Sequence, residues 1–391
     1  MKLTVVGPTH PFRGGISHYT SLLVRTLRRR HQVQFLSYSR QYPSWLYPGN
    51  NDRDPSIRLF IHEKPDRLFD ALNLWAWRKI VRPIREHQSE LVILPWSVVY
   101  WTPFYFTFLR TLKHSTRTAV VFICHNVVEH ESSLFRSTIS RRILSWGDRF
   151  IAHSEWDKAN LVSWLGEARS EQILVNPHPL YQHLSGTSLP KAQARRELGL
   201  ESERVLLFFG FVREYKGLRY LLESLPQILK RGSIHLIVAG EVWGDKRPYL
   251  DLVRKFNLQE HVTFVPEYIP NEKVECYFAA ADLVAIPYVS ATQSGIVQLA
   301  FGFAKPVIVG GVGGLTEVVE HQKTGYLVPP RDSEAIANAV LDFYECRREQ
   351  QMIQNIERSW SRFSWDAMAD TIDRLATGLR ARAPGAGGKR P

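Results

Sequence analysis

The sequence predicts an α/β protein made of two doubly wound, Rossmann-like domains in tandem. The chain has 391 residues, which is about twice the usual domain length. Short apolar runs rich in β-branched residues alternate with helical segments, and the alternation pauses at residues 172–181, which contain two prolines, and then restarts. Strands that are apolar on both faces and separated by helices are typical of a parallel sheet covered by helices on both sides.

In the first half, residues 3–7 (LTVVG) are predicted to form a buried strand. Gly14 and Gly15 follow it and precede a helical segment, ISHYTSLLVRTLRRR. The further strands that we expect in this half are 33–39, 57–63, 91–96, 119–126 and 148–154.

The second half repeats the pattern, and each predicted strand is followed by a helical segment. These strands are 204–212, 234–241, 262–268, 282–288, 306–310 and 325–329. Ligands of such sheets bind outside the carboxyl ends of the strands, so we expect a ligand in the cleft between the two domains. The expected parts are an N-terminal domain at 1–180, a C-terminal domain at 181–360, a last helix at 361–377 and a disordered tail, poor in apolar residues, at 378–391.

The charge of the chain is concentrated in its first half. The formal net charge is +12, and residues 1–180 contain 24 lysines and arginines against 14 acidic residues. This asymmetry indicates an anionic partner for the first half, or a merely soluble basic face. Three widely separated cysteines exclude a disulfide framework and a cysteine-rich metal site. The first residues, MKLTVVGPTHPF, lack the features of a signal peptide, so we expect a cytoplasmic location.

Residues 91–109 form a stretch of 19 residues without a formal charge, which meets the length criterion for a membrane span. Pro95 and Pro103 interrupt it, and it divides into a strand (LVILPW) and an aromatic helical part. Packed core is therefore the favoured interpretation. The alternatives are an aromatic surface that contacts lipid or a lipid-linked substrate, and a true membrane span.

Several loops that follow predicted strands carry groups suited to an anion. Arg213 and Lys216 follow a buried strand, and two cations spaced in this way suit a diphosphate, although a surface charge pair is the alternative. Gly14 and Gly15 permit a ligand to approach the backbone closely at a helix N-terminus, although a plain tight turn would have the same two glycines. A second such helix start, with free N–H groups, is predicted at Ser294, Gly295 and Ile296.

These motifs and their order carry a family resemblance. GGI, CHNVVEHE, GFVREYKG, IVAGE, FVPEYIP, SGIVQLAFGFAKPVI and VGGLTEVV follow one another along nearly the whole chain. The sequence resembles the retaining, GT-B-fold glycosyltransferases of family four, the glycogen-synthase-like and mannosyltransferase-like enzymes. The resemblance implies the GT-B architecture, with two Rossmann-like domains and a cleft between them.

The resemblance also implies roles for individual residues. Gly14 and Gly15 would approach the diphosphate of a nucleotide sugar, and Arg213 and Lys216 would clamp that diphosphate. His125, followed by Asn126, would lie beside the transferred sugar, so the implied catalytic residues are Arg213, Lys216 and His125. The loop around the nucleotide base is expected at Tyr268 and Ile269, with Gly240 and Glu241 nearby.

One segment departs from the family pattern, which has two glutamates eight positions apart. Thr292 occupies the first position, and Leu299 or Ala300 occupies the second. Gln293 and Gln298 are the polar side chains that would replace the carboxylates, with Gln298 near the ribose hydroxyls. Either they take over the hydrogen bonds or sugar binding is altered.

Two apparent metal motifs do not support a metal site. Asp52-Arg53-Asp54 matches an Asp-x-Asp pattern but lies in a polar loop instead of at a strand end. His125, His130 and Glu131 lack the spacing of a metal site. We expect no metal and no cofactor other than the nucleotide-diphosphate sugar as co-substrate, and Glu129 or Glu131 is a candidate for orienting an acceptor hydroxyl.

The resulting hypothesis is a hexosyltransferase that uses a nucleotide sugar and retains the anomeric configuration. Its acceptor would be a glycan or a lipid-linked precursor. The alternatives are a GT-B-fold nucleotide-sugar epimerase and a degenerate, glycosyltransferase-like binding subunit. Nucleic acid is not an expected partner, because aromatic-interleaved basic runs and a recognition helix are missing. Peripheral attachment to an anionic membrane, at its inner face, is expected through Arg28–Arg30, Arg141–Arg142 and the aromatic run Trp96–Phe108.

Overall fold

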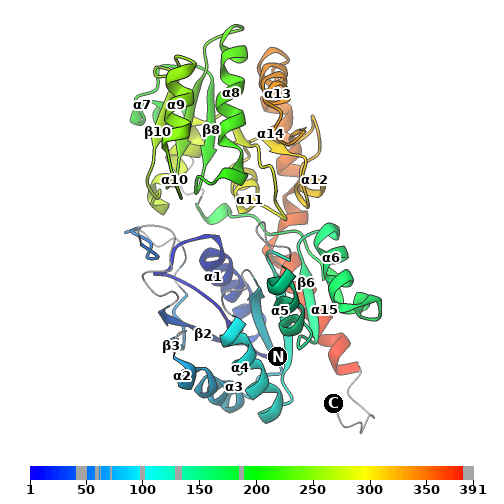
Figure 1. The fold of residues 1–391 in the computed structure, drawn as a ribbon. Helices are drawn as coiled ribbons and strands as arrows, with labels where there is room; N and C mark the ends of the chain where they lie inside the picture. The colour runs from blue at the N-terminus through cyan, green and yellow to red at the C-terminus, as the bar shows by residue number, and fades with distance from the viewer. Residues whose placement is uncertain are drawn as a thin grey trace. The chain divides into compact units, whose positions relative to one another are not determined.

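The computed structural model describes residues 1–40, 51–57, 61, 63–70, 73–96, 102–127, 134–184 and 189–381. The chain divides into two compact units (Figure 1), and each is discontinuous in sequence. Unit 1 comprises Met1–Tyr47, Ile61–Pro177 and Ser364–Pro391. Unit 2 comprises Pro48–Phe60 and His178–Phe363.

Unit 1 contains a seven-stranded parallel sheet with the strand order β3-β2-β1-β4-β5-β6-β7. Its strands are β1 Lys2–Val6, β2 Gln32–Arg40, β3 Arg67–Asp70, β4 Leu91–Trp96, β5 Ala119–Cys124, β6 Arg149–Ala152 and β7 Ile173–Val175. Its helices are α1 Gly15–Arg28, α2 Leu74–Lys79, α3 Val81–His87, α4 Thr102–Ser115, α5 Leu134–Leu144, α6 Glu155–Leu165 and α15 Trp365–Ala381.

The strands of unit 1 bury both of their faces, because successive side chains point to opposite sides of the sheet. In β4, Ile93 packs with α1 and α15, whereas Val92 and Leu94 pack into the core that includes residues of α2–α6. In β5, Val121 packs with α1 and α15, and Phe122 packs into the core on the other face. Helices therefore cover both faces of the sheet, as the unbroken apolar runs predict.

The described residues of the stretch 91–109 contribute to this core. They supply β4 and the start of α4, where Phe104, Tyr105 and Phe108 are buried. Residues 97–101 lie outside the described residues. In the part of the chain that the structure describes, we find no helix with the length and apolar character needed to cross a bilayer.

Unit 2 contains a six-stranded parallel sheet with the order β10-β9-β8-β11-β12-β13. Its strands are β8 Val205–Phe209, β9 His235–Ala239, β10 Val262–Val265, β11 Leu283–Ile286, β12 Val307–Gly310 and β13 Gly325–Val328. Its helices are α7 Lys191–Glu197, α8 Leu218–Leu229, α9 Arg247–Lys255, α10 Asn271–Ala280, α11 Gly295–Gly302, α12 Leu315–Val318, α13 Ser333–Glu345 and α14 Glu349–Ser359. Helices α8, α9 and α13 share one core with Phe208, and α10 packs Phe278 against Phe209 on the other face.

The predicted fold class is confirmed, with two differences in detail. Of the expected strand at 57–63, residues 58–60 and 62 lie outside the described residues; Ile57 lies in a bend and is 92% exposed, and Ile61 and Glu63 are outside any strand. Strand β3 instead takes the free edge of β2. Strand β7 lies within residues 172–181, where the sequence pattern predicts a pause between the two sets of strands. Both are short edge strands, so their apolar signal is weak and a neighbouring edge decides where they form.

Helix α15 is longer than expected and extends to Ala381, so residues 378–381 are helical instead of part of a tail. Residues 382–391 lie outside the described residues. The helix continues because its apolar stripe does: Met368, Ile372 and Leu375 are buried, and Leu379 packs partly against the same core.

Acidic residues on α15 pair with the end of α1. Arg29 Nη2 lies 2.6 Å from Asp366 Oδ1, and Arg30 pairs with Asp370. Arg28 pairs with Glu63 at 2.6 Å. The basic run Arg28–Arg30, which we expected to face a membrane, is therefore neutralised within unit 1. Pairs this exposed contribute little stability each, so the apolar stripe is expected to hold α15.

We predict that Ile372→Ala lowers the free energy of unfolding by about 2–5 kcal/mol, since it opens a cavity in a fully buried position. Asp370→Ala should cost less than about 1 kcal/mol. Urea unfolding followed by circular dichroism compares the two variants. Equal losses would mean that the ion pairs, and not the apolar stripe, hold α15.

Candidate functional site

In both sheets the strand order reverses at the first strand, between β1 and β4 in unit 1 and between β8 and β11 in unit 2. Ligands of doubly wound sheets bind at such switch points, outside the carboxyl ends of the strands. The structure places every sequence-predicted site residue in a loop or helix start that follows one of these strands. Unit 1 contributes Gly14, Gly15, His125 and Asn126, and the remaining predicted residues belong to unit 2.

The helix start at α1 depends on its glycines. Gly14 caps the helix with φ 107° and ψ 162°, a conformation that L side chains rarely adopt. A Cβ atom at Gly14 would meet no atom within 4 Å, so the backbone at this helix start has open space beside it. Gly15 is the first helical residue. This geometry leaves room for a ligand beside the N–H groups of α1.

His125 lies directly after β5 and is 4% exposed. Its backbone N–H donates to the Trp96 carbonyl oxygen at 2.8 Å, which ties the end of β5 to the end of β4. The imidazole packs edge-on against Tyr19, with ring centroids 4.4 Å apart, and lies 5.2 Å from the ring of His153. Asn126 is half-buried beside it. Residues 128–133, with Glu129, His130 and Glu131, lie outside the described residues.

Tyr19 and His153 are members of this cluster that the sequence analysis missed. His153 follows β6 as His125 follows β5, so a histidine directly after a buried strand was the available signal. Its Nδ1–H donates to the Asn176 carbonyl oxygen at 2.8 Å, and burial lowers the pKa of His153 to about 4. The ring of His153 is therefore neutral at physiological pH.

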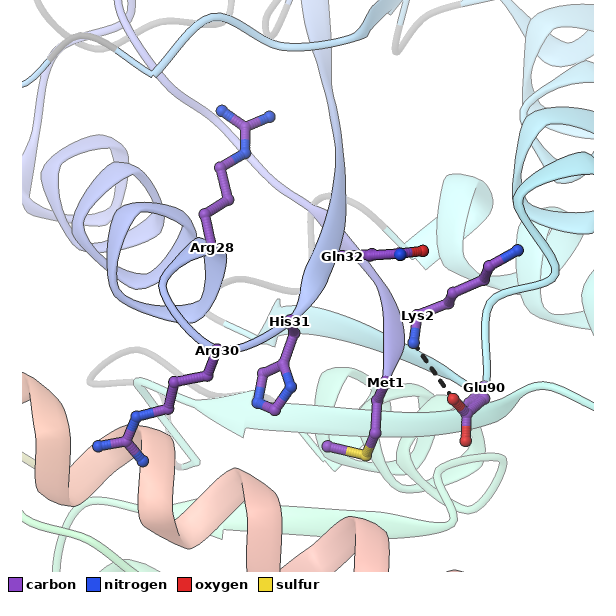
Figure 2. A pocket seen from close by; sticks show the side chains of 7 residues that line it. All are labelled: Met1, Lys2, Arg28, Arg30, His31, Gln32 and Glu90. Atoms are coloured by element: carbon purple, nitrogen blue, oxygen red, sulfur yellow. Dashed lines mark hydrogen bonds between the residues drawn. The ribbon is translucent and has the colours of Figure 1, made fainter.

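A cavity of about 550 Å³ lies at the opposite edge of the unit 1 sheet, at the amino ends of β1 and β2 (Figure 2). Its polar lining is mostly basic, and the Lys2 backbone N–H donates to Glu90 Oε1 at 3.2 Å. The acidic residues that pair with Arg28 and Arg30 offset these charges. Because it opens at the amino edge, this cavity is separate from the predicted site residues. Its lining residues are Met1, Lys2, Arg28, Arg30, His31, Gln32 and Glu90.

In unit 2, the loop after β8 carries a buried cation. Lys216 is 8% exposed and ends a short 3-10 turn, Glu214–Lys216. Its Nζ lies 5.4 Å from the ring centroid of Tyr288, and no carboxylate of the described residues pairs with it. Burial lowers the pKa of Lys216 below its usual value, and the positive charge of Arg213 lowers it further. An anion bound here would compensate for the lost hydration of this ammonium group.

The residues around Lys216 come from two neighbouring loops. A Cβ atom on Gly210 would lie 3.6 Å from Lys216 Nζ and 3.2 Å from Ile296 Cδ1, so α11 begins close to the ammonium group. Tyr288, which lies after β11, is buried, and burial raises its pKa to about 12. Lys216 and the start of α11 therefore surround one small region at the switch point of this sheet.

Gly217 joins the loops that follow β8 and β11. It has φ +71°, and a Cβ atom there would lie 2.0 Å from the Pro287 carbonyl oxygen. The Val289 N–H donates to the Tyr215 carbonyl oxygen at 2.8 Å in the same contact. Only a glycine permits this approach, which holds Lys216 in place.

Gly217→Ala should therefore lower the free energy of unfolding by more than the cost of placing an alanine at a positive φ. Gly199→Ala is the matched control, because Gly199 has φ +65° but no atom within 4 Å of a Cβ. We expect the control to lose about 1–2 kcal/mol, the cost of a left-handed alanine, and Gly217→Ala to lose clearly more. Thermal unfolding measures both. Equal losses would contradict the close contact.

The start of α11 contains the predicted residues Ser294, Gly295 and Ile296. Ser294 Oγ caps the helix and accepts the Ile296 N–H at 3.2 Å. Gln293 is half-buried before it. Gln298 is 2% exposed, and its Oε1 has no hydrogen-bond partner among the described residues. A buried amide oxygen in this state favours Gln298 as a ligand-binding side chain.

The remaining predicted residues follow β9 and β10. A Cβ atom at Gly240 would lie 2.1 Å from the Gly210 carbonyl oxygen, so this glycine permits contact between two loops. The Glu241 carbonyl oxygen accepts the Val212 N–H at 2.9 Å, and the Glu241 residue is 4% exposed. Ile269 is buried, and the Tyr268 hydroxyl donates to Asp54 Oδ2 at 3.4 Å.

Arg213 contacts two aromatic rings that the sequence analysis did not identify. Its guanidinium carbon lies 5.4 Å from the ring centroid of Tyr215 and 5.3 Å from that of Trp243. Arg213 and Lys216 are near enough for the charge of one to lower the pKa of the other. Two cations and an aromatic pair at one sheet edge suit a phosphorylated ligand.

Asp54 of the Asp-x-Asp pattern has protein partners. Its Oδ1 accepts the Ser56 N–H at 2.9 Å, and its Oδ2 accepts from Tyr268 and Asn271. In the described ranges, we find no group of three or more histidine, cysteine or acidic side chains that could hold a metal ion.

Two family models match the chain in tandem. Residues 13–179 match "Glycosyltransferase Family 4", and residues 203–346 match "Glycosyl transferases group 1". An uncharacterised glycosyltransferase of Methanocaldococcus jannaschii is 33% identical over 202 residues, which are 50% of each chain. The D-inositol 3-phosphate glycosyltransferase of Nocardia farcinica is 29% identical over 51% of this chain and 46% of its own. The chain thus spans about half the length of the curated relatives it matches.

The fold also matches solved structures over nearly its whole length. A sucrose-phosphate synthase from Thermosynechococcus elongatus has a TM-score of 0.74 at 22% identity and covers 98% of this chain and 100% of its own. HepE of Anabaena, in complex with UDP and glucose, has a TM-score of 0.75 at 18% identity, with coverage of 97% and 100%. At these identities the likeness establishes the shared fold.

Proposed function

Because this chain belongs to the GT-B glycosyltransferases of family 4, we propose that it transfers a hexose from a nucleoside-diphosphate sugar to a glycan or lipid-linked acceptor, with retention of anomeric configuration. One observation carries the proposal: Lys216 is a buried cation without a carboxylate partner among the described residues, at the switch point of its sheet and near Arg213. The complex of HepE with UDP-glucose, a structure with the same fold, supports a nucleotide sugar as donor.

In this proposal Lys216 and Arg213 stabilise the diphosphate as it leaves. Negative charge on its oxygens increases as the bond to the anomeric carbon breaks, so fixed cations stabilise the transition state more than the bound donor. The acceptor oxygen bonds to the anomeric carbon on the same face, and its proton passes to an oxygen of the departing diphosphate. This route requires no carboxylate nucleophile, which agrees with Thr292 at the first glutamate position and Leu299 or Ala300 at the second.

The remaining predicted residues would bind the donor. Gln298, with its buried amide oxygen, would hydrogen-bond the ribose hydroxyls, and Tyr268 and Ile269 would line the base. In unit 1, His125 would lie beside the transferred sugar, and the start of α1 at Gly14 would approach the diphosphate.

The absent glutamates favour a second candidate, a glycosyltransferase-like subunit that binds a nucleotide sugar without transferring it. An epimerase acting on the same donor is the third. A thermal-shift screen with UDP-, GDP- and ADP-sugars identifies the donor, since a ligand at 100 times its dissociation constant stabilises by about 2.7 kcal/mol. Analysis of the products then separates transfer, epimerisation and simple binding.

Lys216→Ala and Arg213→Ala should each lower kcat/KM by about 10²–10³-fold, by analogy with the loss of one oxyanion-hole donor. Arg219→Ala is the matched control, because Arg219 is exposed on α8 and pairs with Glu223. Transfer from the identified donor is measured for each variant, and circular dichroism checks the fold. Near wild-type kcat/KM in the Lys216 or Arg213 variant would exclude these residues as the diphosphate clamp.

We further propose that transfer needs no divalent metal, because the two cations and the start of α11 already supply positive charge. Activity should be unchanged after dialysis against EDTA. A loss of activity that Mg²⁺ or Mn²⁺ reverses would contradict this proposal and would make Asp52 and Asp54 candidate metal ligands.

Peripheral attachment to an anionic membrane, in the cytoplasm, remains part of the proposal, with fewer residues in support. Arg28–Arg30 are paired within unit 1, whereas Arg141 and Arg142 are exposed on α5 and Phe106 is 40% exposed on α4. Co-sedimentation with anionic vesicles should fall with salt and in Arg141→Glu/Arg142→Glu. Equal binding to neutral vesicles would exclude electrostatic attachment.

A further inference from the structure

We propose that Trp243 is a positioning residue that orients Arg213 toward the donor diphosphate, and that Asp54 holds the same aromatic row from its other end. The aromatic row is defined as Tyr268, Phe211 and Trp243. This inference rests on the proposed function, because it assigns to Arg213 the role of binding a diphosphate.

Arg213 contacts the rings of Trp243 and Tyr215. The guanidinium carbon lies 5.3 Å from the ring centroid of Trp243 and 5.4 Å from that of Tyr215. Contact with two aromatic rings restricts the rotamers of a long side chain, and the planar guanidinium suits bidentate binding of phosphate oxygens. Restricting the cation before the ligand binds reduces the entropy that binding costs.

Trp243 is itself held in place by backbone and ring contacts. Its backbone N–H donates to the Val212 carbonyl oxygen at 3.0 Å, and a β-bridge joins Val212 to Val242. Its ring packs on Phe211 with centroids 4.4 Å apart, and Phe211 lies 6.2 Å from the ring of Tyr268. The row therefore connects the loops that follow β8, β9 and β10.

The segment Asn51–Ile57 lies between β2 and β3 in sequence but belongs to unit 2. Asp54 Oδ2 accepts from the Tyr268 hydroxyl at 3.4 Å and from Asn271 Nδ2 at 3.2 Å. Ser56 Oγ accepts the Asn271 N–H at 2.8 Å, at the start of α10. A segment from the first half of the sequence thus holds the loop that carries Tyr268.

These contacts predict direct coupling between Trp243 and Arg213, and weaker coupling between Asp54 and Arg213 through the aromatic row. Without Trp243, Arg213 would be free to leave the diphosphate. Without Asp54, the Tyr268 hydroxyl would lose its carboxylate acceptor, with a smaller effect on Arg213 because two further rings intervene. Neither Trp243 nor Asp54 needs to touch the nucleotide for this effect.

The test is a double-mutant cycle on nucleotide affinity. Isothermal titration with UDP, and with GDP and ADP in parallel, gives the dissociation constant of the wild type, Trp243→Leu, Arg213→Ala and the double variant. We expect about five- to tenfold weaker binding for each single variant. We also expect the double variant to bind no more weakly than Arg213→Ala alone, because Trp243 acts only through Arg213.

Conservative and matched variants exclude a merely structural role. Trp243→Phe keeps a ring against the guanidinium and should recover most of the affinity, and Trp156→Leu, at an exposed position of α6, should not change it. Asp54→Ala removes the acceptor of Tyr268 and should weaken binding about threefold to fivefold, whereas Asp52→Ala in the same segment should not.

The outcomes separate the inference from the function on which it rests. Binding by the wild type with additive losses in the double variant, or without rescue by Trp243→Phe, would overturn the positioning role alone. Failure of the wild type to bind any of the three nucleotides would overturn the proposed function, and the inference with it.

Discussion

The desolvated ammonium group of Lys216 is the feature on which the site in unit 2 depends. Burying a charge without a partner costs folding free energy, so the surrounding loops must hold it in place. They do so through backbone contacts so close that Gly217 and Gly240 leave no room for a side chain. A bound anion would offset this cost, and in the proposed reaction the same positive charge would stabilise a leaving diphosphate.

The distribution of charge has a different meaning in the folded chain than along the sequence. Arg29 and Arg30 of the basic run Arg28–Arg30 pair with acidic residues of α15 that come more than 300 positions later in the sequence. The two segments compensate each other inside unit 1. A net charge counted over half of a chain therefore overstates the charge that its surface offers to a membrane or another partner.

The site combines family features with local departures. Its cations and helix starts follow the carboxyl ends of strands, whereas the two glutamates are missing; a buried glutamine, Gln298, lies on α11, and its amide oxygen has no hydrogen-bond partner in the described part of the chain. Aromatic residues that the sequence analysis did not identify surround the cations: Tyr288 beside Lys216, and Trp243 beside Arg213. In the proposed reaction such rings orient the charges, so the chemistry depends on side chains that themselves need not react.

The sequence by itself determined the α/β class, most strands and the place of the predicted site. Parallel strands all end at one edge of their sheet, so residues directly after buried strands lie at that edge, as His125 does in unit 1 and Lys216 does in unit 2. Only the tertiary structure decided which edge β3 would join, that Asn51–Ile57 would pack on α10, and that Trp243 would stack on Arg213. These outcomes depend on contacts between residues far apart in the chain, and local apolar patterns contain no information about such contacts.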